Sequence, residues 1–199
     1  MTNRAGDRAT RPAPTVVEAV ASSSSCAGPA PEPQPPSRQP DPHELARQIV
    51  LRQLAMAPKS RAQLEEKLAH RDCSPDVAAA VLDRLTEVGL IDDHAYAQML
   101  VRSRQAGRGL AKGALARELR TKGIDDDLAQ EALATISDAD EHSRARELVD
   151  KKLRAMHGLG IEVQTRRLVG MLARKGYPSN LAYAVIRDAI ADAPEYLPD

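Results

Sequence analysis

The feature of this sequence that most constrains its fold is an internal repeat with a period of just over 50 residues. A pair of leucines four positions apart occurs three times, at Leu64 and Leu68, Leu115 and Leu119, and Leu168 and Leu172, with offsets of 51 and then 53 residues. Four residues span just over one turn of an α-helix, so each pair lies on one helix face. Apolar positions on both sides keep the same offsets. The pattern therefore favours three tandem units of three helices each.

Capping residues set the expected helix starts in the first unit. Asp41 precedes a proline, Ser74 precedes another, and Ser60 is followed three residues later by Gln63. Each side chain can accept a hydrogen bond from a free amide in the first helical turn. No alternating strand pattern of useful length is present, so the sequence predicts helices separated by short turns.

We therefore predict an all-α protein, in which three tandem three-helix repeats form an elongated, curved helical body. The expected parts are a disordered Pro/Ser-rich tail over 1–40, repeats over 41–91, 92–136 and 137–193, and a C-terminal tail over 194–199. Each repeat is too short to bury much core alone, so we expect stacking of the repeats to hide more apolar surface. The N-terminal tail is open to two interpretations, a flexible extension or a docking arm.

Charge is strongly segregated along the chain, although 28 basic and 28 acidic residues cancel overall. Residues 99–123 carry seven basic residues and one acid, a sum of +6. Residues 124–143 carry seven acids and no Lys or Arg, and residues 144–175 again sum to +6. The balance excludes a uniformly basic protein that coats nucleic acid through bulk charge, but it allows separate cationic patches.

The segment 102–113 is the most informative of these stretches, because it combines three glycines with four cations. We expect it to join two helices and to bind a polyanion or an acidic protein surface, since arginine pairs with phosphate and carboxylate in bidentate fashion. The alternative is a solvated segment whose cations pair with the acidic run that follows. The candidate binding residues are Arg102, Arg104, Arg108 and Lys112, with Arg117, Arg120 and Lys122 on an adjoining face, and a second group of Arg144, Arg146, Lys151, Lys152, Arg154, Arg166 and Arg167.

Catalytic and cofactor motifs are missing from the sequence. The five histidines are scattered, Cys26 and Cys73 show no metal or disulfide spacing, and no phosphate-binding glycine loop is present. We therefore expect no enzyme activity, no metal and no cofactor. Without a long apolar run or a secretory signal, we expect a cytoplasmic protein. Tyr96 and Tyr183 fall in helical apolar stripes and are predicted to be core residues, which leaves little aromatic surface for stacking nucleic acid bases.

Three short motifs resemble a known family. The run Leu90-Ile-Asp-Asp-His-Ala-Tyr-Ala97 resembles the repeat-junction motif of the RecX family, which has a hydrophobe, two acids and an aromatic–alanine pair. The core of that family's second repeat is similar to the series Arg102, Arg104, Gly107, Gly109, Leu115, Leu119 and Lys122-Gly-Ile124. The family's third-repeat signature is similar to Arg174-Lys-Gly-Tyr177. The resemblance covers about residues 45–190 and departs where this chain has tyrosine in place of the family's usual phenylalanine. It implies structural roles at the junctions for Asp92, Asp93, Tyr96, Gly123, Gly176 and Tyr177.

The resemblance implies a non-catalytic modulator of the RecA recombinase that acts in DNA repair, recombination and the SOS response. Members of the family bind the RecA filament on single-stranded DNA, lodge in its groove and also contact DNA. They suppress filament extension, ATP hydrolysis, strand exchange and coprotease activity. For this chain the implied partners are the RecA filament and single-stranded DNA, with double-stranded DNA as a further candidate, and we expect a monomer.

Two other functions are compatible with the residues. One is a stand-alone DNA-binding regulator in which each repeat acts like a helix-turn-helix, which would need base-reading side chains at the start of its third helix. The third helices of the first two repeats begin with acids, at Asp76 and at Asp125–Asp127, and these would be repelled by phosphates. The other is a neutral helical adaptor for a different protein.

Overall fold

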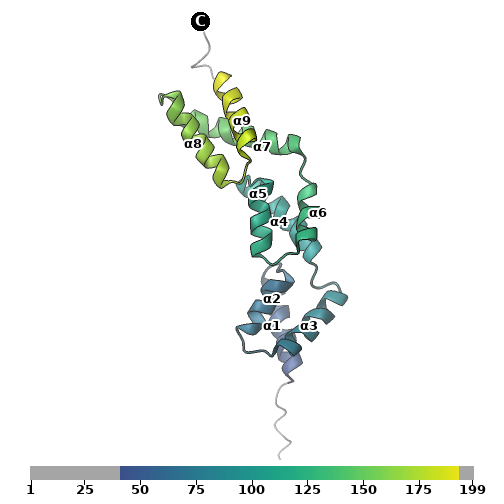
Figure 1. The fold of residues 1–199 in the computed structure, drawn as a ribbon. Helices are drawn as coiled ribbons and strands as arrows, with labels where there is room; N and C mark the ends of the chain where they lie inside the picture. The colour runs from purple at the N-terminus through teal and green to yellow at the C-terminus, as the bar shows by residue number, and fades with distance from the viewer. Residues whose placement is uncertain (1–40, 193–199) are drawn as a thin grey trace, which may run out of the picture. The chain divides into compact units, whose positions relative to one another are not determined.

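The computed structural model describes residues 41–192, and both predicted tails lie outside this range. Within it the chain is entirely helical, which confirms the all-α prediction (Figure 1). The helices are α1 (Pro42–Met56), α2 (Arg61–Ala69), α3 (Pro75–Glu87), α4 (Asp93–Arg108), α5 (Lys112–Thr121), α6 (Asp126–Ala134), α7 (Asp138–Leu153), a short 3-10 helix η1 (Arg154–Met156), α8 (Ile161–Arg174) and α9 (Ser179–Ala191).

The helices pack in consecutive groups of three, which we call the first (α1–α3), second (α4–α6) and third (α7–α9) repeats. Each group closes around its own hydrophobic cluster, and the leucine pairs found in the sequence are among the most deeply buried side chains. Most of the apolar core thus lies inside each repeat rather than between repeats. Three short helices rich in Leu, Val, Ile and Ala bury their apolar stripes within one repeat. Ala111 is an exception, because it precedes α5 and packs in the third repeat's cluster.

The predicted caps are present in the first repeat. Asp41 accepts a hydrogen bond from the amide of His43, and Ser74 accepts one from Val77. Ser60 and Gln63 form a reciprocal capping box at the start of α2. Such caps satisfy amides that have no partner inside the helix, and replacing one by alanine typically costs about 1 kcal/mol.

Successive repeats are joined by hydrogen bonds at equivalent positions. At the first junction the Ser60 hydroxyl donates to the carbonyl of Lys122 at 2.6 Å. At the second, the amide of Ala111 donates to the carbonyl of Lys175 at 2.9 Å. In both cases the residue before the second helix of one repeat meets the turn after the second helix of the next repeat.

A carboxylate supports each junction by accepting a hydrogen bond from the first amide of the second helix. Asp93 accepts from the amide of Arg61, and Glu141 accepts from the amide of Lys112, both at 2.8 Å. Carboxylates are favourable at this position because a helix N-terminus carries partial positive charge. A tyrosine hydroxyl adds a further bond at each junction, from Tyr96 to Gln63 Oε1 at 3.2 Å and from Tyr177 to the Gly109 carbonyl at 3.2 Å.

Glycine lets the backbones approach closely at both junctions. Gly123 and Gly176 have φ values of 69° and 86°, in the left-handed region. A Cβ atom at Gly123 would overlap the Cβ of Ala62, and one at Gly176 would lie 2.6 Å from the Cβ of Ala114. Glycine is therefore required at both turns for backbone conformation and for space.

Candidate functional site

The cationic segment 102–113 is mostly helical, and the expectation that it forms a connection between helices is wrong. Helix α4 continues to Arg108, so Arg102, Arg104 and Arg108 lie on its last two turns. Only residues 109–111 connect it to α5. Gly109 is the actual stop, with a φ of 60° and an amide that bonds back to the Gln105 carbonyl.

Three of the predicted cations in the second repeat are engaged in ion pairs. Arg104 contacts Glu118 at 2.6 Å, with both side chains less than one-third exposed. Lys112 Nζ contacts Asp138 at 2.8 Å, and this hydrogen bond raises the pKa of Lys112 and lowers that of Asp138. The pair therefore joins the second repeat to the third. Arg120 meets Asp126 at 3.4 Å on the open surface, where such a pair stabilises little.

The other arginines of the second repeat form no ion pair among residues 41–192. Arg102, Arg108 and Arg117 are exposed, and Lys122 is half-buried with its carbonyl used at the first junction. The acidic run 124–143 thus neutralises only part of the cationic stretch, through Asp126 and Asp138. Another acid of this run has a structural role, because Asp125 caps α6 by accepting a hydrogen bond from the amide of Asp127. The exposed arginines remain available to an external anion.

The third repeat holds a larger set of available cations. Arg144 pairs with Glu147 at 2.8 Å, and Arg146 bridges Asp150 and Asp192, which raises its pKa. The remaining predicted cations are exposed and form no ion pair in the described part of the chain; they are Lys151, Lys152, Arg154, Arg166 and Arg167.

One further cation was not selected from the sequence. Arg174 is exposed near the end of α8, seven residues after Arg167. Seven residues are close to two helical turns, so the two arginines share a face of α8. That spacing was visible in the sequence and could have identified Arg174. A basic residue in the last turn is also favoured by the helix dipole.

Of the two tyrosines predicted to lie in the core, one is buried and one is exposed. Tyr96 is buried as expected, and burial raises the pKa of its hydroxyl. Tyr177 is also buried. Tyr183 is 56% exposed, so the prediction that it is a core residue is wrong. It lies at the edge of the apolar stripe of α9, next to Ala182, which faces the cluster.

Other classes of site receive no support from residues 41–192. No group of three or more His, Cys, Asp or Glu side chains there is placed to hold a metal ion. Among the same residues, none of the helices combines the length and the apolar character that crossing a membrane requires. The exposed cations of α4, α5, α7, η1 and α8 form the candidate site.

Comparison with known families accounts for all three repeats. Models of the first, second and third three-helix domains of RecX match residues 46–85, 92–133 and 139–186. A regulatory protein RecX from Thermobifida fusca is 47% identical over 159 residues, which cover 78% of this chain and 86% of that protein. One from Streptomyces coelicolor is 49% identical over 155 residues, covering 78% of this chain and 82% of the relative.

Solved structures show the same arrangement of helices. The crystal structure of RecX from Lactobacillus salivarius superposes with a TM-score of 0.69 at 22% identity, covering 75% of this chain and 97% of that chain, and this is a likeness of fold alone. A second crystal structure, of a regulatory protein RecX, gives a TM-score of 0.67 at 26% identity and covers 74% of this chain and 72% of that one.

Proposed function

Because the chain belongs to the RecX family, we propose that it inhibits the RecA recombinase by binding the filament that RecA forms on single-stranded DNA. In this proposal the protein is non-catalytic. It limits filament extension, and with it ATP hydrolysis, strand exchange and coprotease activity. DNA repair and the SOS response are the processes that it would regulate.

The observation that supports this proposal most is the set of exposed cations without ion pairs in the second and third repeats. Arg102, Arg108 and Arg117 project from α4 and α5, and Arg166 and Arg167 from α8. A filament on DNA presents phosphates and carboxylates, which arginine binds through charge-assisted bidentate hydrogen bonds. Surface cations that already form an ion pair would contribute less free energy to filament binding, because each must first give up its carboxylate partner.

The junctions would give these cations a fixed spacing. Lys112 contacts Asp138, and Lys175 Nζ donates to the carbonyl of Arg108, so α4 and α5 are tied to the third repeat. Cations held on rigid helices lose less conformational entropy on binding than the same residues on a flexible loop. We propose that the cations of α4, α5 and α8 contact one filament together.

The triple variant Arg102→Ala, Arg108→Ala, Arg117→Ala tests this assignment. Each arginine that pairs with a phosphate of single-stranded DNA contributes about 0.7 to the slope of log K against log salt concentration. We expect the variant to bind RecA–DNA filaments more weakly, with a salt slope reduced by about 2. The measurement is fluorescence anisotropy of filaments on labelled oligonucleotide over a range of salt concentrations.

A matched control removes the same number of positive charges elsewhere. Arg47, Arg84 and Arg187 are exposed, and each already pairs with a carboxylate within three residues of it. The variant Arg47→Ala, Arg84→Ala, Arg187→Ala should keep the filament affinity and salt slope of the unmodified protein. Equal losses in the two triple variants would show that only net charge matters and would remove the site assignment.

A further inference from the structure

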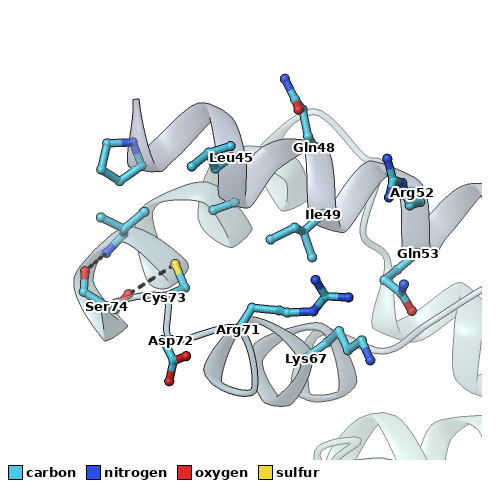
Figure 2. Close-up of a pocket in the computed structure, with 13 residues that line it drawn as sticks. Leu45, Gln48, Ile49, Arg52, Gln53, Lys67, Arg71, Asp72, Cys73 and Ser74 are labelled. Atoms are coloured by element: carbon cyan, nitrogen blue, oxygen red, sulfur yellow. Dashed lines mark hydrogen bonds between the residues drawn. The ribbon is translucent and has the colours of Figure 1, made fainter. Parts of the chain in front are cut away.

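We propose that the first repeat carries a separate binding groove for an acidic, amphipathic protein segment, between α1 and the turn that joins α2 to α3. The groove has a volume of about 630 Å³ (Figure 2). It involves none of the cations assigned to the filament, so the inference goes beyond the proposed function.

The position of the groove follows from the repeat. With the offset of 51 residues, Arg71 and Asp72 correspond to Lys122 and Gly123, and Leu45 corresponds to Tyr96. In the second repeat these equivalents are contact residues, because the Lys122 carbonyl binds Ser60, Gly123 packs on Ala62, and Tyr96 binds Gln63. The groove is therefore the face with which each later repeat docks onto the repeat before it. Among residues 41–192 no repeat precedes the first one.

Two differences from the second repeat make this face unsuitable for another repeat. Asp72 stands where the junctions have glycine, in the same left-handed conformation with a φ of 57°, and its Cβ fills the space that Gly123 leaves for Ala62. Pro42 stands at the position of Asp93, so the carboxylate that binds a helix N-terminus is missing. A second copy of this chain, stacked as the repeats are, would meet steric overlap and lose a hydrogen bond.

The charge of the groove selects its partner. Arg52, Lys67 and Arg71 line it and form no ion pair with any residue that the structure describes, and Asp72 is the one acid in its lining. Figure 2 shows Arg71 and Lys67 on the wall opposite Ile49. A segment that brings carboxylates would therefore gain new charge-assisted hydrogen bonds.

The floor of the groove favours a protein segment over nucleic acid. Ile49 and Val77 are half-buried and pack on the first repeat's cluster, and Leu45 is 43% exposed at the rim. Aliphatic side chains on a partner would be buried against these residues, whereas a phosphate backbone would cover them poorly. An apolar floor with a cationic rim is the arrangement that receives an amphipathic helix or strand.

A binding experiment on the full chain, without RecA or DNA, tests this inference apart from the proposed function. The probe is a fluorescein-labelled glutamate-rich peptide with leucine at every third or fourth position. One control peptide has serine in place of leucine, and another has lysine in place of glutamate. We expect saturable binding of the first peptide, at least about tenfold tighter than either control.

The double variant Lys67→Glu, Arg71→Glu should weaken this binding about tenfold or more and keep the helical circular dichroism of the unmodified protein. The double variant Arg84→Glu, Arg187→Glu, on the surfaces of α3 and α9 outside the groove, is the matched control and should bind as before. Absence of saturable binding, or binding that the double variant leaves unchanged, would overturn the proposal. If labelled oligothymidine binds more tightly than the peptide, and the double variant loses this binding, the groove is a site for nucleic acid and the proposal is wrong. If the unmodified chain associates with itself and the double variant does not, the groove binds a second copy of this chain and the proposal is also wrong.

Discussion

Replacing Gly176 with alanine should separate the second and third repeats while leaving each repeat's own hydrophobic cluster intact. The new Cβ would lie 2.6 Å from the Cβ of Ala114 and 2.9 Å from its Cα. Ordinary contacts between carbon atoms are about 3.5–4.0 Å, so the two backbones would have to move apart by about 1 Å. That movement would break the 2.9 Å hydrogen bond from Ala111 to the Lys175 carbonyl.

The expected cost can be worked out from the contacts at this junction. A non-glycine residue in the left-handed conformation costs about 1–2 kcal/mol. The lost Ala111–Lys175 hydrogen bond adds about 0.5–1.5 kcal/mol, and the bond from the Lys112 amide to Glu141 adds about 1.5–3 kcal/mol because its acceptor is charged. We therefore expect Gly176→Ala to lower the free energy of unfolding by about 3–6.5 kcal/mol.

The assay is urea unfolding followed by circular dichroism, with Gly89→Ala as the control. Gly89 has a φ of 72°, but nothing lies within 4 Å of a Cβ built there, so its replacement should cost only the conformational part, about 1–2 kcal/mol. The Gly176 variant should also show a smaller m value, as its repeats unfold less cooperatively. If Gly176→Ala lowers the free energy of unfolding no more than Gly89→Ala does, the close approach of Gly176 to Ala114 is refuted.

Three further predictions follow from single contacts. Burial raises the pKa of Tyr177 from its usual 10.0 to about 12. The protonated Tyr177 hydroxyl therefore stabilises the fold fully below pH 10, and this stabilisation is lost as the pH rises from 10 to about 12. Between these pH values the free energy of unfolding should fall less in Tyr177→Phe than in the unmodified protein, as measured by urea unfolding at each pH. Asp92→Ala removes the cap on the Ala95 amide and should cost about 1 kcal/mol in urea unfolding, most of which Asp92→Asn should restore; an unchanged midpoint would contradict the cap. Glu118→Gln frees Arg104 from its ion pair and should steepen the salt slope of filament binding by about 0.7, whereas an unchanged slope would show that Arg104 does not reach the phosphates.

Much of the local structure could be predicted from the sequence, because it depends on neighbouring residues. The leucine pairs defined one face of the second helix in each repeat, and Ser60 with Gln63 marked the start of α2. Ser74 was placed correctly as the cap of α3, since a serine directly before a helical proline can accept from a free amide of the first turn.

Contacts between distant residues could not be predicted in the same way. The meeting of Ser60 with Lys122 depends on how two repeats pack, which no local pattern specifies. Tyr183 was misplaced because helical spacing defines a stripe but not its edge. The groove was also missed, since the repeat offset pairs Asp72 with Gly123 but does not reveal that Gly123 packs on Ala62.

The same limit applies to the candidate filament site. Composition located the cationic stretches, but it could not separate Arg104, which is paired with Glu118, from Arg102, which is exposed. Helix α4 also extends further than its glycines suggested. A single glycine inside a helix costs only about 1 kcal/mol, so Gly107 does not end it.

The most direct test of the proposed function is the rate of single-stranded-DNA-dependent ATP hydrolysis by RecA as this protein is added in substoichiometric amounts. DNA is kept in excess, so that sequestration of DNA cannot imitate inhibition. We predict that the rate falls with added protein and that Arg102→Ala, Arg108→Ala, Arg117→Ala inhibits more weakly. An unchanged rate, together with no binding of this protein to RecA filaments, would contradict the proposal that it regulates RecA.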